Sequence, residues 1–185
     1  MEYFKLTDTP ELEHAPKLRD WYGRFDVRDI TLASYTKLPN REMFFVEEEA
    51  GMQFTDIILF PFLLISRQVN AVIKMYREVC FTKEIVLFDQ RKEKAEIYYL
   101  PIFDETNQIM LATCRYEDGV CVSRTGQAGM SAAAVEKHIF WVKEGDKRHT
   151  ILSLDLAESL IRRGITGLGL EEVRLYNKEE KGDRV

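Results

Sequence analysis

The sequence has few of the features that mark membrane-spanning, secreted disulfide-rich or disordered chains. Its longest apolar run is Ile57–Ile65, nine residues that include Pro61, whereas about 20 are needed to span a bilayer. No basic stretch followed by an apolar core stands at the start, so we expect no signal peptide. Glycine (10) and proline (5) are scarce, and 45% hydrophobic residues indicate a packed core. We therefore expect a soluble, cytoplasmic, globular protein.

Cysteine is scarce as well. The three cysteines, Cys80, Cys114 and Cys121, are odd in number and lack CxxC spacing, so they favour neither a disulfide framework nor a zinc site. Cys80 follows the end of a predicted helix, where the helix dipole raises the pKa of a thiol. Cys114 and Cys121 lie on the two arms of a predicted hairpin without a visible activating base. We interpret that pair as small buried apolar residues rather than as a reactive or metal-binding pair.

Basic residues are fewer than acidic residues. Lys and Arg number 26 against 31 Asp and Glu among 185 residues, which gives a formal net charge of −5. This balance does not favour a nucleic-acid partner. The densest acidic run is Glu47, Glu48 and Glu49, and Asp104 and Glu105 follow a predicted strand. We predict that these five acids are exposed, either as a solvated turn or as a patch that faces a basic protein partner.

The residue patterns that carry chemistry are largely missing. The histidines have no HxH, HExxH or HxxxH spacing. His138 and His149 flank a predicted hairpin. A metal site there would require the two histidines to lie close together and a third ligand such as Glu144 or Asp146. The loop Ser123–Ser131 contains glycines but lacks the spacing of a phosphate-binding loop. We therefore predict no catalytic residues, no cofactor and no metal ligands.

Two segments have the spacing of short amphipathic helices. Ser66–Val79 places apolar residues on one helical face behind an N-capping serine, and Ser153–Gly164 does the same with a glycine stop. Pro101 indicates an edge or a bulge in its strand, and Asp118-Gly119 is a strong hairpin signal. The predicted strands are Glu84–Phe88, Ala95–Phe103, Ile109–Arg115, Val120–Ser123, His138–Lys143 and Glu172–Tyr176.

The two helix–strand units repeat each other. A shift of the first by 87 residues places Ser66 on Ser153, Ile73 on Leu160 and Val86 on Val173 without a gap. This pattern indicates either an internal duplication or the shared periodicity of any two such units. The units span about 62–90 and 150–177. The predicted core consists of Val69, Ile73, Val86, Phe88, Leu156, Leu160, Val173 and Leu175.

We therefore expect an α+β fold that forms a single domain over residues 1–185. One mixed or mainly antiparallel sheet would carry the two units packed together, because strands outnumber helices and follow one another without helices in the middle of the chain. Near the N-terminus we expect strands at Met1–Leu6 and Met43–Glu47, with a short helix in Pro10–Trp21 disturbed by Pro16. Residues 177–185 are expected to form a charged tail.

Two blocks of the chain resemble a family of immunity proteins from bacterial polymorphic-toxin systems, often called immunity family eleven. The first block, Phe54–Tyr99, contains the segment Pro61–Ser66 ahead of the first helix and the strand Lys83–Leu87 after it. The second, Ile139–Tyr176, contains Arg163–Glu171, which is similar to the family's glycine-containing ending. The first 50 residues and the hairpin near residue 118 depart from the family pattern.

The resemblance implies a non-catalytic protein that binds a cognate toxin, possesses no catalytic residues, and neutralises the toxin by steric occlusion. Exposed acids, foremost Glu47–Glu49 and Asp104-Glu105, would speed association with a basic toxin. Two alternatives stay open at this point. One is a small enzyme whose site is assembled from distant polar residues, and the other is an adaptor that binds a protein through a sheet edge.

Overall fold

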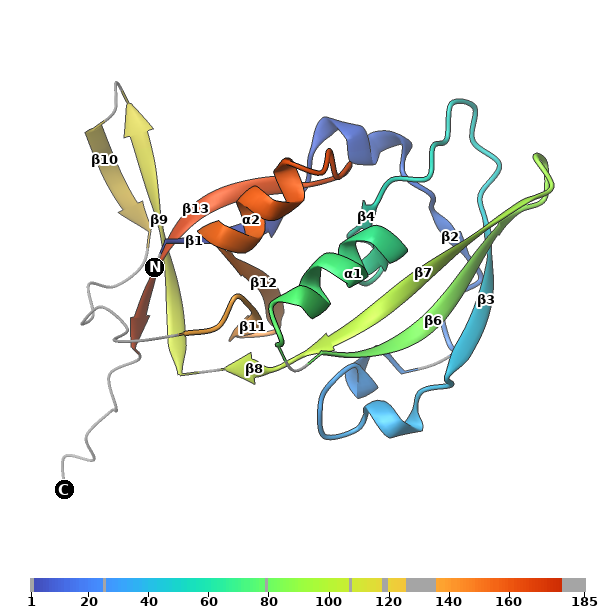
Figure 1. Cartoon of the computed structure of the whole chain (residues 1–185), viewed down its shortest axis with the longest axis horizontal. Helices are drawn as coiled ribbons and strands as arrows, with labels where there is room; N and C mark the ends of the chain where they lie inside the picture. The colour runs from blue at the N-terminus through green and yellow to red at the C-terminus, as the bar shows by residue number, and fades with distance from the viewer. Residues whose placement is uncertain are drawn as a thin grey trace.

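Two β-sheets and two short α-helices make up most of the structure (Figure 1), a computed structural model that describes residues 2–24, 26–78, 80–106, 108–117, 120–125 and 136–177. Both sheets are mixed, so the predicted α+β class is confirmed. The expectation of one shared sheet is wrong, because each helix–strand unit belongs to a sheet of its own.

The elements follow in sheet order. The seven-stranded sheet consists of β10 (Val120–Thr125), β9 (Ile109–Glu117), β13 (Gly169–Asn177), β1 (Tyr3–Thr7), β12 (Lys147–Ser153), β11 (Ile139–Glu144) and β8 (Glu105–Thr106). The six-stranded sheet consists of β2 (Leu18–Arg19), β3 (Arg41–Val46), β6 (Cys80–Asp89), β7 (Lys94–Phe103), β5 (Leu64–Ser66) and β4 (Ile57–Ile58). The helices are α1 (Arg67–Met75) and α2 (Leu154–Ile161), with 3-10 turns at Pro10–His14, Val27–Asp29 and Tyr35–Lys37.

The two units share one topology. In each, a strand leads into the helix and the next strand returns to the same sheet, with one antiparallel strand between the two. That middle strand is β7 in the first unit and β1 in the second. Strand β7 follows directly from β6, whereas β1 comes from the N-terminus. The second unit is therefore completed by a segment about 150 residues away in the sequence, which local periodicity cannot reveal.

Serine begins both helices as predicted. Ser66 Oγ accepts a hydrogen bond from the Val69 N–H, and Ser153 Oγ accepts one from the Leu156 N–H, each at 3.3 Å. The helices lie side by side in Figure 1, and the Tyr76 hydroxyl donates to the Asp155 carbonyl at 2.8 Å. The predicted packing of the two units is therefore confirmed.

The main core lies between the sheets and the helices and draws on both sheets. A second, smaller cluster lies within the seven-stranded sheet, which curls so that β9 contacts β11. Six of the eight predicted core residues are buried. Val86 and Phe88 are only half-buried, and Ile85 and Leu87 take their place in the core. Both faces of β6 are apolar in sequence, so alternation does not indicate which one is buried.

The remaining local predictions are largely confirmed. Strands β9 and β10 pair antiparallel with Val120 opposite Glu117, although Asp118-Gly119, the predicted turn, lies outside the described residues. Pro101 lies in β7, which pairs with β6 on one side and with β5 on the other. The pairing with β5 ends at Tyr99, so at Pro101 one side of β7 has no neighbouring strand. Pro10–His14 forms a 3-10 turn that ends before Pro16. The tail beyond residue 177 lies outside the described residues.

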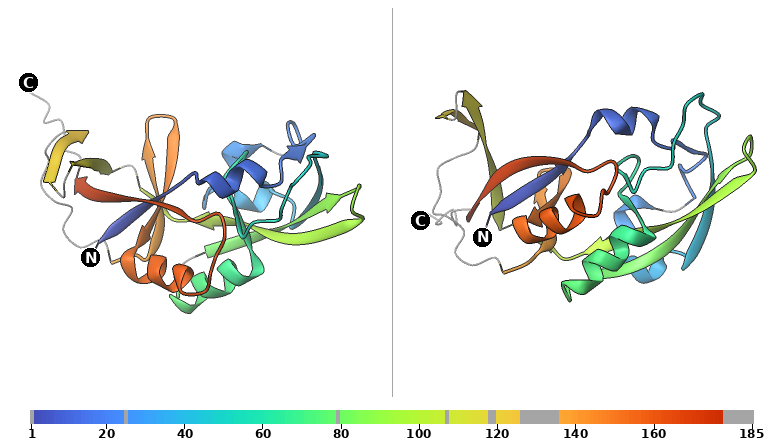
Figure 2. Two further views of the ribbon diagram at one scale, coloured as in Figure 1. Left: turned by 90° about the horizontal axis from the view of Figure 1, so that it is seen from above. Right: turned by 45° about the horizontal axis from the view of Figure 1, so that its top comes forward.

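The layers are plain in Figure 2, where α1 and α2 lie on one side and the N-terminal 3-10 turns and hairpin β11–β12 project to the other. Among the described residues, neither helix is long and apolar enough to cross a membrane.

Candidate functional site

The acidic run follows β3 directly. Glu47 and Glu48 are exposed as predicted, whereas Glu49 is half-buried and its carboxylate contacts Lys17 Nζ at 2.9 Å. The Glu47 N–H donates to the Lys17 carbonyl at 2.8 Å, which fixes the backbone where the strand ends. Within the described ranges, the carboxylates of Glu47 and Glu48 form no ion pair, and the backbone that carries them is anchored.

The other two predicted acids lie elsewhere. Asp104 and Glu105 are half-buried, because Asp104 forms an ion pair with Lys137 and the Glu105 carboxylate contacts Arg148 Nε at 2.6 Å. They follow one end of β7, whereas Glu47 lies near its other end. Ten residues of β7 separate the two groups, a distance of roughly 30 Å. The five acids therefore form two separate groups, and a role for either in partner binding stays a prediction.

Close to Glu47, apolar side chains form two cross-strand rows on one side of the six-stranded sheet. Met43 pairs with Val86, and Val86 pairs with Ile97. One step further along, Phe45 pairs with Phe88, whose ring lies 6.0 Å from that of Phe45 in an edge-to-face contact. We call these five residues the outer face.

The outer face is only partly covered. The side chains of Met43 and Ile97 are 45% and 38% exposed, and the other three residues are half-buried. Helix α1 contacts β5 and β7, and the sheet extends beyond it toward the β6–β7 turn (Figure 1). A contiguous apolar patch on a soluble protein marks an interaction site more often than a scattered exposed residue does.

Charged side chains border the outer face. The Arg19 guanidinium lies 5.8 Å from the centre of the Phe45 ring, and Arg41 Nε contacts the Glu84 carboxylate at 2.5 Å. Together with Glu47 they give an apolar centre with a polar rim, the usual anatomy of a protein interface. The sequence had pointed to the acids alone, because tertiary packing decides which side of an apolar run such as residues 85–88 is exposed.

The histidine pair considered in the sequence does not form. His138 lies opposite Ser153 and His149 opposite Val142, so about 13 Å of strand separates them along the hairpin. His149 Nε2 is 3.7 Å from a Glu144 carboxylate oxygen, and burial lowers the pKa of His149 below its usual value. Within the described ranges, no group of three His, Cys, Asp or Glu side chains has the geometry to hold a metal ion.

His138 instead contacts a helix cap. Its Nδ1 lies 2.8 Å from Ser153 Oγ, and its ring lies 4.7 Å from that of Tyr76. Because Ser153 is completely buried and its oxygen already caps α2, this serine–histidine contact has a structural role.

The cysteine that the structure describes is unreactive. Cys80 is half-buried, and burial raises the pKa of its thiol to about 11, so the thiol stays protonated at neutral pH. The largest cause of the raised pKa is loss of solvent on burial. The side chains of Cys114 and Cys121 lie outside the described part of the chain.

No family model matches the sequence, and no curated protein and no solved structure is significantly similar to the chain. These comparisons therefore do not bear on the functional class.

Proposed function

We propose that the protein is a non-catalytic, cytoplasmic immunity protein that binds a cognate bacterial toxin and neutralises it by steric occlusion. The observation that carries the proposal is the outer face, two cross-strand rows of apolar side chains that are only partly covered. The resemblance of two sequence blocks to polymorphic-toxin immunity proteins supports the same class. The adaptor alternative lacks its expected signal, because Pro101 is buried even though no strand pairs with one side of β7 there.

The outer face is preorganised for binding. Strand β6 is held from its other side by Ile85 and Leu87, which are 1% and 0% exposed. The five side chains therefore project from a fixed sheet, so little conformational entropy is lost when a partner covers them. Burial of apolar side chains at the centre supplies affinity, and complete burial of one large apolar side chain contributes about 1.5–3 kcal/mol.

Charge next to the outer face sets the speed of association. Glu47 and Glu48 are free of ion pairs among the described residues and lie beside the row of Phe45 and Phe88. A basic toxin would be attracted to this end of the sheet before apolar contact is made. Occlusion then requires no chemical step, since a protein seated over the toxin's active surface excludes its substrate.

The test is rescue of growth when the toxin domain encoded beside this gene is co-expressed. Met43→Lys places a charge at one end of the Met43–Val86–Ile97 row of the outer face, and Met75→Lys makes the same change on α1, where Met75 is 63% exposed. We expect wild type and M75K to protect cells and M43K to lose protection at equal protein levels. Protection by M43K equal to that by M75K would refute the outer face as the interface, and failure of the wild type to protect against any adjacent toxin domain would refute the class.

A further inference from the structure

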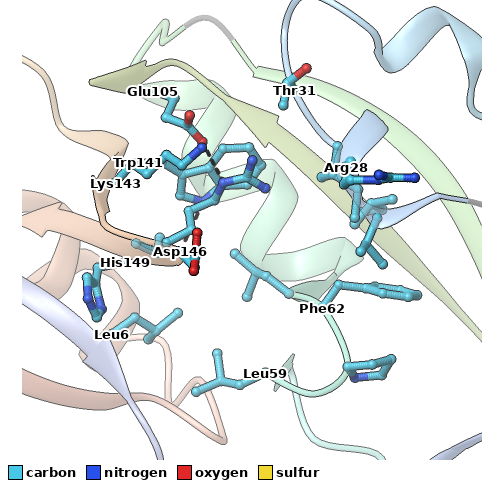
Figure 3. A pocket seen from close by; sticks show the side chains of 17 residues that line it. Leu6, Arg28, Thr31, Leu59, Phe62, Glu105, Trp141, Lys143, Asp146 and His149 are labelled. Atoms are coloured by element: carbon cyan, nitrogen blue, oxygen red, sulfur yellow. Dashed lines mark hydrogen bonds and ion pairs between the residues drawn. The ribbon is translucent and has the colours of Figure 1, made fainter. Parts of the chain in front are cut away.

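A cleft of about 640 Å³ lies on the opposite side of the six-stranded sheet from the outer face. Figure 3 shows it between hairpin β11–β12 and the segments that cover the inner side of the sheet. Leu100 of β7 lines the cleft and is three residues from Ile97, so the two side chains lie on opposite sides of the strand. The cleft is therefore separate from the proposed toxin interface.

One wall of the cleft is a ladder of polar and aromatic side chains. Trp141 pairs with Thr150, and its indole N–H donates to Thr150 Oγ1 at 3.1 Å. The next pair on the same side of the hairpin is Lys143 and Arg148. Two like charges directly opposite each other in a sheet destabilise the pairing. This arrangement therefore costs stability unless an anion lies near it.

Arg148 is held in place for such an anion. Its guanidinium stacks on the Trp141 ring at 4.4 Å, and its Nε donates to Glu105 at 2.6 Å. Both contacts leave the two terminal Nη groups available, and these form no hydrogen bond within the described residues. Lys143 has no hydrogen bond or ion pair with the described part of the chain. Glu105 neutralises Arg148. Asp146 also lines the cleft but forms no ion pair with Lys143, so Lys143 stays unpaired within the described residues.

The facing wall is largely apolar. Leu59, Phe62 and Leu63 come from the loop before β5, although Arg28 and Thr31 also line this side. Leu6 of β1 lies beside His149, next to the hairpin (Figure 3). Phe62 is 7% exposed and its ring lies 6.4 Å from that of Phe44, so this wall is anchored in the core. A cavity of this size with mostly apolar walls and a few convergent polar groups is typical of small-molecule sites.

We propose that the cleft binds a small organic anion with an apolar body. The anionic group, a carboxylate or an equivalent oxyanion, lies between Lys143 Nζ and the Arg148 Nη atoms, where charge-assisted hydrogen bonds are strongest. The apolar body extends over Phe62 and Leu63 toward Leu100. The ligand relieves the repulsion between the two cations and fills the hydrophobic wall.

The experiment is calorimetric titration of the full chain with 2-naphthoate, and with 2-naphthamide as a neutral analogue of the same shape. Lys143→Gln removes the cation that forms no ion pair within the described residues. Lys147→Gln is the control, because Lys147 pairs with Glu144 on the side of the same hairpin that faces away from Lys143 and Arg148. We expect saturable 1:1 binding of naphthoate, weaker binding of the amide, and affinity about tenfold lower in K143Q but unchanged in K147Q.

Three outcomes would overturn the proposal. They are no saturable naphthoate binding below about 1 mM, equal affinity for naphthoate and the amide, or equal losses in K143Q and K147Q. Since Lys143 and Lys147 are both exposed, neither substitution threatens folding, and circular dichroism verifies this. None of these outcomes depends on the toxin, so the result is independent of the proposed function.

Discussion

The two helix caps allow a quantitative test of the repeated architecture. Ser66 and Ser153 occupy equivalent positions, yet their surroundings differ. Ser66 is half-buried and caps α1 through one hydrogen bond, whereas Ser153 is fully buried and its hydroxyl also contacts His138 Nδ1. Loss of a serine N-cap costs about 0.5–2 kcal/mol. We expect Ser66→Ala to lower the free energy of unfolding by about 1 kcal/mol.

Ser153→Ala should cost more, about 2–3 kcal/mol, because it removes the cap and also leaves the His138 nitrogen without its partner. Urea unfolding followed by circular dichroism measures both values, with the m-value checked for constancy. Ser159→Ala, in the same helix but away from the cap, serves as the control and should change stability by less than about 0.5 kcal/mol. Equal costs at the two caps, or a smaller cost at Ser153, would refute the argument.

Three further predictions concern charge and titration. The double substitution Glu47→Lys and Glu48→Lys should slow association with a basic toxin at low ionic strength. Stopped-flow association rates of variant and wild type should converge at high salt. Equal rates at low salt would leave the acidic run as a solvated turn. The pKa of Cys80 is raised to about 11, so iodoacetamide should alkylate it far more slowly than free cysteine at pH about 8. Peptide mass spectrometry measures the rate, and rapid labelling would contradict the burial of Cys80. Burial, with Lys5 nearby, lowers the pKa of His149 below 6.5, so the unfolded chain binds the proton at a higher pH than the folded chain does. The free energy of unfolding should therefore fall as the pH drops below about 6.5. His149→Gln should reduce this dependence of the free energy on pH, as urea unfolding can measure.

Local features of the fold were predictable wherever one residue type decides the structure. The serine caps and the spacing of Val69 and Ile73 predict α1, and they do so because capping and amphipathic periodicity act within one helix. Strand β6 shows the limit. Its sequence offers two apolar faces, and only the packing of the N-terminal segment against one of them decides that Ile85 is buried while Val86 remains accessible.

Long-range features were not predictable from one sequence. The division into two sheets depends on β1 inserting between β12 and β13, a pairing that spans most of the chain. The outer face and the cleft have the same origin, since each gathers side chains from strands distant in sequence. The charges of Glu47 and Glu48 were visible, but the apolar rows beside them became evident only from the strand register.

The most direct test of the central claim is calorimetric titration of the purified toxin domain encoded beside this gene into wild type, Ile97→Lys and Ile161→Lys. Ile97 is the most exposed member of the outer face on β7, and Ile161 is equally apolar and 59% exposed on α2. We predict tight 1:1 binding by wild type and I161K, and at least tenfold weaker binding by I97K, because the new ammonium group loses its hydration when the outer face is covered. Absence of binding to the toxin domain, or equal affinities of I97K and I161K, would contradict the proposed function.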